Sequence, residues 1–118
     1  MITEILLSVC LILGGDRITC EELPDPIVVE SVVVDVMRDV TQRPFIGFHF
    51  IGEEYIFVDP HTPEPARTYV IVHEITHYVQ DYLTPEASIC AREEQAYRVE
   101  YTWAGIEYSD KWRETYGC

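Results

Sequence analysis

Basic residues are scarce in this sequence. Its 118 residues include eight lysines and arginines against 21 aspartates and glutamates, which gives a formal net charge of -13 at pH 7. A chain this acidic repels the phosphate backbone of nucleic acids and the headgroups of anionic lipids. We therefore expect no nucleic-acid partner. The acidic excess suits a basic peptide, another cationic ligand or a divalent metal ion, and it equally serves to keep a small protein soluble.

Long apolar runs are absent as well. The apolar stretch from Ile5 to Leu13 is far shorter than the roughly 20 residues that a membrane-spanning helix needs. The residues before it include Glu4 but no lysine or arginine, whereas export signals begin with positive charge. We expect this stretch to form a buried N-terminal helix without stable membrane insertion. The protein should be soluble, with the cytoplasm favoured over export.

Closely spaced cysteines are also missing. The four cysteines form no Cys-x-x-Cys or Cys-x-x-His pair, which excludes the usual thiolate zinc sites. Cys10 lies within an apolar run and is expected to behave as a small buried hydrophobic residue. A disulfide between two of Cys20, Cys90 and Cys118 would fit an exported protein and would be unstable in a reducing cytosol, so the cysteines leave the compartment open.

The chain contains no internal repeat, low-complexity tract or linker, and its length suits one hydrophobic core. We therefore expect a single domain over residues 1–118. The expected elements, in chain order, are a helix over the first apolar run, a loop, a strand at 27–29, a helix at about 31–40, a hairpin, a helix from 63 to about 83, and a last helix that ends near 105. Helices with one small sheet make an α+β fold.

Local signals set several of these boundaries. Ser31 is an acceptable N-cap for the second helix. Two aromatic and β-branched runs flank Gly52, which predicts a hairpin whose second strand is 55–58. Thr62 as N-cap and Pro63 at the first helical position mark the start of the next helix.

Residue spacing also predicts which side chains share a face. The predictions are Val32, Val36 and Val40 on one helix face; Phe45, Gly47, His49 and Ile51 on one face of the first hairpin strand, with Ile46, Phe48 and Phe50 on the other; and Ile89, Ala96, Val99 and Trp103 packing inward from the last helix.

Two imidazoles one turn apart stand in an otherwise apolar helix. The stretch from Val70 to Gln80 reads VIVHEITHYVQ, with His73 and His77 four residues apart. Their Cβ atoms would lie about 5–6 Å apart on one face, so both rings can bind one ion, and zinc is the expected cofactor. Glu74 is rotated by about 100° from His73. It can hold a metal-bound water and take its proton, which makes Glu74 the expected catalytic residue.

A third metal ligand must come from elsewhere in the chain. The residues after His77 lack the glycine and third histidine of the pattern HExxHxxGxxH, which excludes that class of site. The following helix offers Glu93, Glu94 and Glu100. Helical phase favours Glu93, because it shares a stripe with Ala96, whereas Glu94 turns toward solvent.

The combination of HEITH with the later REEQAY resembles the gluzincin-type metallopeptidases, especially the small minimal gluzincin-like proteins of bacteria and phages. Larger relatives carry E-x-x-A-D or E-x-x-A-N on the second helix, and their ligand is the glutamate three residues before the alanine. Because Ala96 matches that alanine, the resemblance implies Glu93 as ligand, while Tyr97 replaces the Asp or Asn. The resemblance covers about residues 44–103. It implies a small zincin-like domain, with a hairpin packed on the two ligand-bearing helices and an edge strand to which a peptide adds.

These features together predict a zinc-dependent hydrolase, and specifically a metallopeptidase that acts on a peptide or protein substrate. Its metal ligands would be His73, His77 and Glu93, and Glu74 would activate water. The alternative is a non-catalytic zincin-fold protein used for binding or regulation, because 118 residues leave little room for the walls of a broad substrate cleft.

Supporting roles fall on fewer residues. Glu100, two turns after Glu93, is placed to accept the free N–H of a ligand histidine, or is a solvated charge. Tyr97 and Tyr101 are candidates to stabilise an oxyanion, although packing with an exposed hydroxyl is the commoner use of tyrosine. We expect His49 and His61 to be surface residues rather than ligands.

Overall fold

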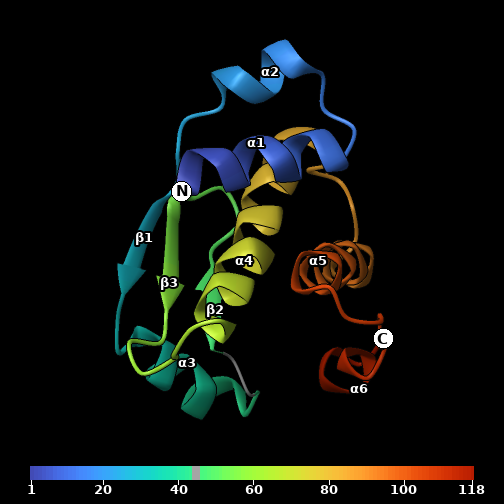
Figure 1. The fold of residues 1–118 in the computed structure, drawn as a ribbon. Helices are drawn as coiled ribbons and strands as arrows, with labels where there is room; N and C mark the ends of the chain where they lie inside the picture. The colour runs from blue at the N-terminus through green and yellow to red at the C-terminus, as the bar shows by residue number, and fades with distance from the viewer. Residues whose placement is uncertain (44–45) are drawn as a thin grey trace.

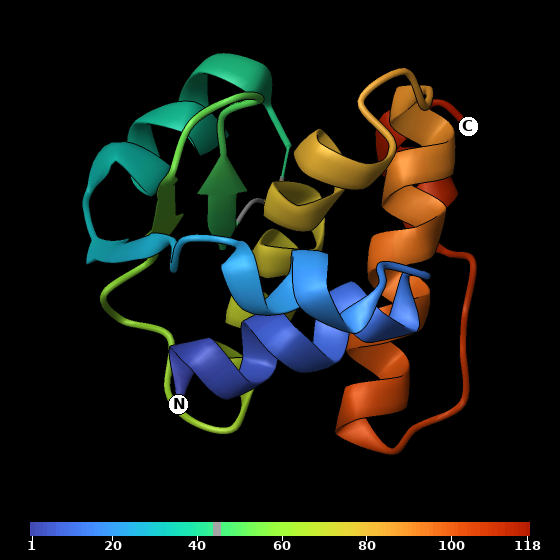
Figure 2. The same ribbon diagram turned by 90° about the horizontal axis from the view of Figure 1, so that it is seen from above.

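The computed structural model describes residues 1–43 and 46–118. Helices combine with a three-stranded sheet, which confirms the α+β class. The elements are α1 (Ile2–Ile12), α2 (Arg17–Glu22), β1 (Ile27–Glu30), α3 (Val33–Thr41), β2 (Gly47–His49), β3 (Tyr55–Val58), α4 (Ala66–Leu83), α5 (Ile89–Ala104) and α6 (Trp112–Tyr116). The sheet lies on one side of α4 and α5 on the other, while α1 crosses α4 (Figure 1). Figure 2 shows the same arrangement from above.

The sheet has the strand order β1-β3-β2. Strand β1 runs parallel to β3, and β2 pairs with β3 in antiparallel register, with Phe48 opposite Phe57. The predicted hairpin is therefore confirmed, including its second strand and Gly52 at the turn, where φ is +83°. The part of the first strand predicted at Phe45 lies outside the described residues. Strand β2 is an edge strand and lies against α4.

Helix α4 forms the centre of the molecule. Its apolar residues Val72, Ile75 and Val79 are completely buried. The N-terminal run is the expected helix, α1, and its Ile5 and Val9 belong to the same core. No helix within residues 1–43 and 46–118 combines the length and the apolar character needed to cross a membrane.

Some boundaries differ from the prediction. Helix α4 begins at Ala66 and not at Pro63, because a residue that precedes a proline disfavours the helical conformation and Glu64 precedes Pro65. The short helix α2 lies where a loop was expected, and its N-cap Asp16 accepts a hydrogen bond from the Thr19 N–H. Helix α6 was not predicted, since a five-residue helix leaves almost no periodic signal.

Two predicted faces look toward solvent. The valines Val32, Val36 and Val40 of the α3 region are all exposed, because the opposite face of α3 is fixed to the protein by an ion pair between Arg38 and Asp59 at 2.9 Å. On α5, Ala96 and Val99 pack inward as expected, but Ile89 and Trp103 are exposed, and that part of the prediction is wrong.

Two disulfides link the cysteines, Cys10 with Cys20 and Cys90 with Cys118. Cys10 is fully buried as predicted, but it is not a free thiol. Helix α2 folds back beside α1 and brings the two Cα atoms to 5.6 Å, within the range that a disulfide spans. The Cys90–Cys118 bond is one of the pairings that the sequence left open.

Gly47 permits the close approach of β2 to α4. A Cβ atom at this position would lie 2.3 Å from Val70 Cγ1 and 3.3 Å from Glu74 Oε2. We expect Gly47→Ala to lower the free energy of unfolding by about 1–3 kcal/mol, the usual cost of overpacking a core, as measured by urea denaturation. The double variant with Val70→Ala should recover part of the loss, because it removes the clashing methyl group. A Gly47→Ala protein as stable as the parent would contradict this close approach.

Candidate metal centre

Three predicted metal ligands meet at one point between α4 and α5. His73 and His77 lie one turn apart on α4, and Glu93 reaches them from the second turn of α5. Their ligand atoms all lie within 4.8 Å of one another. The two Nε2 atoms are 3.2 Å apart, His73 Nε2 lies 3.5 Å from Glu93 Oε2, and His77 Nε2 contacts Glu93 Oε1.

Two of these three separations are close to those around a tetrahedral metal ion, whereas His77 Nε2 and Glu93 Oε1 are in direct contact. With metal–ligand bonds of about 2.0–2.1 Å, two ligand atoms of a tetrahedral zinc site are about 3.3–3.4 Å apart. The distances of 3.2 and 3.5 Å lie on either side of that value. Glu93 Oε2 is also buried without a hydrogen-bond partner, which is unusual for a carboxylate oxygen unless an ion or water binds it. The group can therefore hold a metal ion.

Partners on the outer side of both imidazoles fix their orientation. His77 Nδ1 lies 2.9 Å from Gln80 Oε1. Because an amide oxygen only accepts, Nδ1 donates, and the lone pair of Nε2 faces the metal centre. Gln80 is itself held, since its Nε2 donates to the Arg92 carbonyl at 3.0 Å.

His73 has the carboxylate partner that the sequence suggested. Its Nδ1 lies 2.9 Å from Glu100 Oε1, so Glu100 orients the imidazole of His73 and is not merely a solvated charge. Glu94, in contrast, points away from the centre and pairs with Arg113. Helical phase therefore placed Glu93, and not Glu94, on the side of α5 that faces the two histidines.

The same contacts shift the pKa values of the centre. Burial by itself would lower the pKa of His73, but hydrogen bonds to Glu100 and Glu93 outweigh burial and raise it to about 10. Burial would raise the pKa of Glu93, and the two histidines overcome that effect and hold its pKa well below the usual range. Without a metal ion, the centre therefore keeps a proton on His73 at neutral pH.

This proton must leave when a metal ion binds, because only the neutral imidazole is a ligand. At pH 7.5 we expect zinc binding to release about one proton, since the pKa of His73 is about 10. Titration calorimetry in buffers of different ionisation enthalpy measures this number as the slope of the observed heat. Glu100→Gln should reduce the slope and weaken zinc binding about 10–100-fold. Identical heats in all buffers would show that His73 is already neutral.

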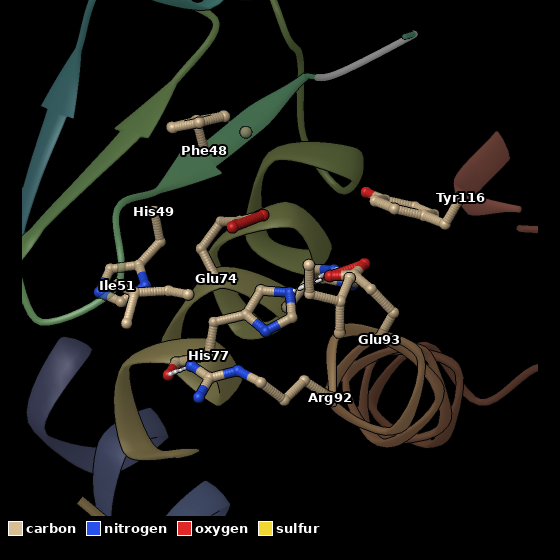
Figure 3. A pocket seen from close by; sticks show the side chains of 11 residues that line it. Phe48, His49, Ile51, Glu74, His77, Arg92, Glu93 and Tyr116 are labelled. Atoms are coloured by element: carbon tan, nitrogen blue, oxygen red, sulfur yellow. Dashed lines mark hydrogen bonds and ion pairs between the residues drawn. The ribbon is translucent and has the colours of Figure 1, made fainter. Parts of the chain in front are cut away.

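Glu74 lies beside the ligands and does not join them. Its side chain is buried, and its carboxylate lies beneath β2, facing the cavity (Figure 3). Burial raises the pKa of Glu74, and the neighbouring His73 and His77 partly offset this effect. A buried carboxylate with a raised pKa, next to a metal centre, is suited to proton transfer.

The ligands face a cavity of about 230 Å³. Its walls come from β2 and the hairpin turn, from α4, from the start of α5 and from α6. A second cavity, of about 170 Å³, shares Gly47, His73, Glu74 and Tyr116 with the first. The two cavities thus adjoin at the metal centre and form one cleft, with β2 on one side and Tyr116 of α6 on the other.

Two wall residues were not foreseen as such. His49 was expected at the surface, but its side chain is only 1% exposed. Its Nε2 donates to the Glu53 carbonyl at 2.7 Å, and burial lowers its pKa. Arg92 is buried as well and donates to the His77 carbonyl at 3.2 Å. His61 is exposed, as predicted.

Of the two tyrosines predicted as candidates to stabilise an oxyanion, Tyr97 lines the cleft and Tyr101 does not. Tyr97 packs edge-to-face on His73, with centroids 4.4 Å apart, and stacks on Trp112. It also lines the second cavity, whereas Tyr101 lines neither.

Comparisons with protein-family models, with curated proteins and with solved structures found no match for this chain.

Proposed function

We propose that this protein is a zinc-dependent hydrolase, and specifically a metallopeptidase of the gluzincin type. Support comes most directly from one observation: the ligand atoms of His73, His77 and Glu93 converge within 4.8 Å beside the buried carboxylate of Glu74. The donor set also favours zinc, since two imidazoles and one carboxylate leave a fourth position open in catalytic zinc sites.

The residues around the centre supply the parts of a hydrolytic mechanism. A zinc ion held there provides Lewis-acid polarisation of a substrate carbonyl. Glu74 accepts the proton of the attacking water and returns it to the departing amine. Gln80 and Glu100 keep the two imidazoles aimed at the centre while the charge changes.

A peptide is the substrate class that best fits the cleft. Strand β2 forms hydrogen bonds with β3 along one edge, and its other edge is at the side of the sheet where the cavities lie. An extended peptide can add to such an edge through its main chain and bring a carbonyl group to the metal centre. The net charge of -13 favours basic peptides over acidic ones.

The second candidate is a metal-containing binding protein without turnover. The small size of the cleft supports it, because its two parts, of about 230 and 170 Å³, together reach only the lower end of the usual 300–1,000 Å³ range of ligand sites. Metal analysis of the purified protein, followed by incubation of the zinc-loaded protein with a peptide library, separates the two. Zinc near one equivalent with cleavage supports the hydrolase. Zinc with every peptide intact supports the binding protein, and absence of metal binding overturns both.

A further inference from the structure

The two disulfides differ sharply in their access to solvent. Cys10 and Cys20 are 0% and 2% exposed and belong to the hydrophobic core. Cys90 and Cys118 are both exposed and line a shallow surface depression. A thiol reductant must reach a sulfur atom to attack it, so exposed disulfides are the labile ones. A reductant should therefore open Cys90–Cys118 well before Cys10–Cys20.

The exposed disulfide tethers helix α6. Cys90 lies in the first turn of α5, and Cys118 follows directly after α6 and its C-cap, Gly117. Helix α6 has only five residues, too few to be stable by themselves. Non-covalent contacts supplement the disulfide. Trp112 stacks on Tyr97 with centroids 5.3 Å apart, Arg113 pairs with Glu94, and the Arg43 guanidinium lies 5.3 Å from the centroid of the Tyr116 ring.

Helix α6 carries a residue of the cleft. Tyr116 lines both cavities of the metal centre, together with His73 and Glu74. In Figure 3 its ring extends from α6 into the cavity, and its hydroxyl is directed toward the side where Glu74 and Glu93 lie. Only one residue, Gly117, separates Tyr116 from Cys118 in the chain. The metal ligands, by contrast, belong to α4 and α5 alone.

We propose that the Cys90–Cys118 disulfide is a redox latch on the cleft, and that Tyr116 contacts the bound ligand only while the latch is closed. A dithiol opens it in two exchange steps: the dithiol gives two electrons and two protons, becomes a cyclic disulfide, and leaves two cysteine thiols. Helix α6 then loses its covalent tether, and the cleft loses the wall opposite β2. Zinc stays bound, because no ligand moves. The part of this inference that concerns ligand binding rests on the proposed function.

The latch is tested first without any ligand. The zinc-loaded protein is treated with limiting dithiothreitol, alkylated, and mapped by mass spectrometry together with hydrogen exchange. We expect label on Cys90 and Cys118, faster exchange over residues 105–118, and unchanged zinc content. Equal labelling of Cys10 and Cys20, or α6 amides that stay protected after reduction, would overturn the latch.

Ligand binding is tested with a dipeptide hydroxamate, a probe that chelates zinc and extends along the cleft. The Cys90→Ser/Cys118→Ser and Tyr116→Ala variants should each bind it about tenfold more weakly, the loss of roughly 1.4 kcal/mol expected when a hydrogen bond and a ring contact disappear. The control, Cys10→Ser/Cys20→Ser, should lose stability but bind the probe like the parent. If the Tyr116→Ala protein binds the probe like the parent, Tyr116 does not contact the bound ligand and that part of the proposal is wrong. If the parent itself neither binds the probe nor cleaves peptides, the proposed function fails, while the exchange result still decides the latch.

Discussion

Replacing Glu74 with glutamine should lower kcat for peptide hydrolysis by about 10²–10⁴-fold, the contribution typical of a general acid–base group. Glutamine keeps the size of the side chain but cannot take a proton from water at neutral pH. Because Glu74 is not a metal ligand in this geometry, the variant should bind zinc as the parent does. Steady-state kinetics and metal analysis on the same preparation measure both quantities.

The stability of this variant provides its internal control. Burial raises the pKa of Glu74 above its usual value of 4.5, so the folded state binds a proton more tightly than the unfolded state does. As the pH rises above 4.5 and Glu74 ionises, its contribution therefore lowers the free energy of unfolding. At pH 7, Glu74→Gln should be as stable as the parent or more stable. Unchanged activity in a zinc-loaded, folded variant would remove Glu74 from the mechanism.

Replacing Glu93 with glutamine should remove most of the zinc. The neutral amide is a much poorer ligand than a carboxylate, and its NH₂ group would face two imidazole nitrogens that are already 3.2 Å apart. Zinc at 1,000 times its Kd should stabilise the parent by about 4.1 kcal/mol, and the variant should lose nearly all of this zinc-dependent gain. Thermal unfolding with and without zinc, together with zinc content after dialysis, measures the effect.

Glu94→Gln is the matched control for that experiment, because Glu94 is the next residue on the same helix and pairs with Arg113 instead. It should bind zinc like the parent and retain the full stabilisation. Loss of zinc in the Glu94 variant, with zinc kept in the Glu93 variant, would mean that α5 presents the other carboxylate to the centre.

The parts of the site that could be predicted from the sequence are those set by local geometry. The spacing of His73 and His77 fixes their common face once a helix forms, and helical phase alone selected Glu93 over its neighbour. The wall residues depend on long-range packing. His49 is buried because the hairpin turn folds against Asp81, whose carboxylate accepts from the Gly52 N–H at 2.8 Å, and no local pattern encodes that contact.

The position of helix α6 was even harder to predict from local sequence patterns. Its place beside the cleft depends on a disulfide that closes over 28 residues of chain, and cysteine counting left several pairings open. The start of α4 was misplaced for a local reason, since the Thr-Pro signature competes with a second proline two residues later.

The burial of α4 has a consequence for how firmly the site is preorganised. Every residue from Val70 to Gln80 is buried, so on the sides away from the cavity each imidazole is held by the neighbours that pack around it. A side chain normally loses conformational entropy when it binds an ion. Here the two imidazoles have already lost most of that entropy on folding. In the proposed function, a metal ion would therefore bind to side chains that are already ordered, and its affinity would reflect bond formation more than the cost of ordering the chain.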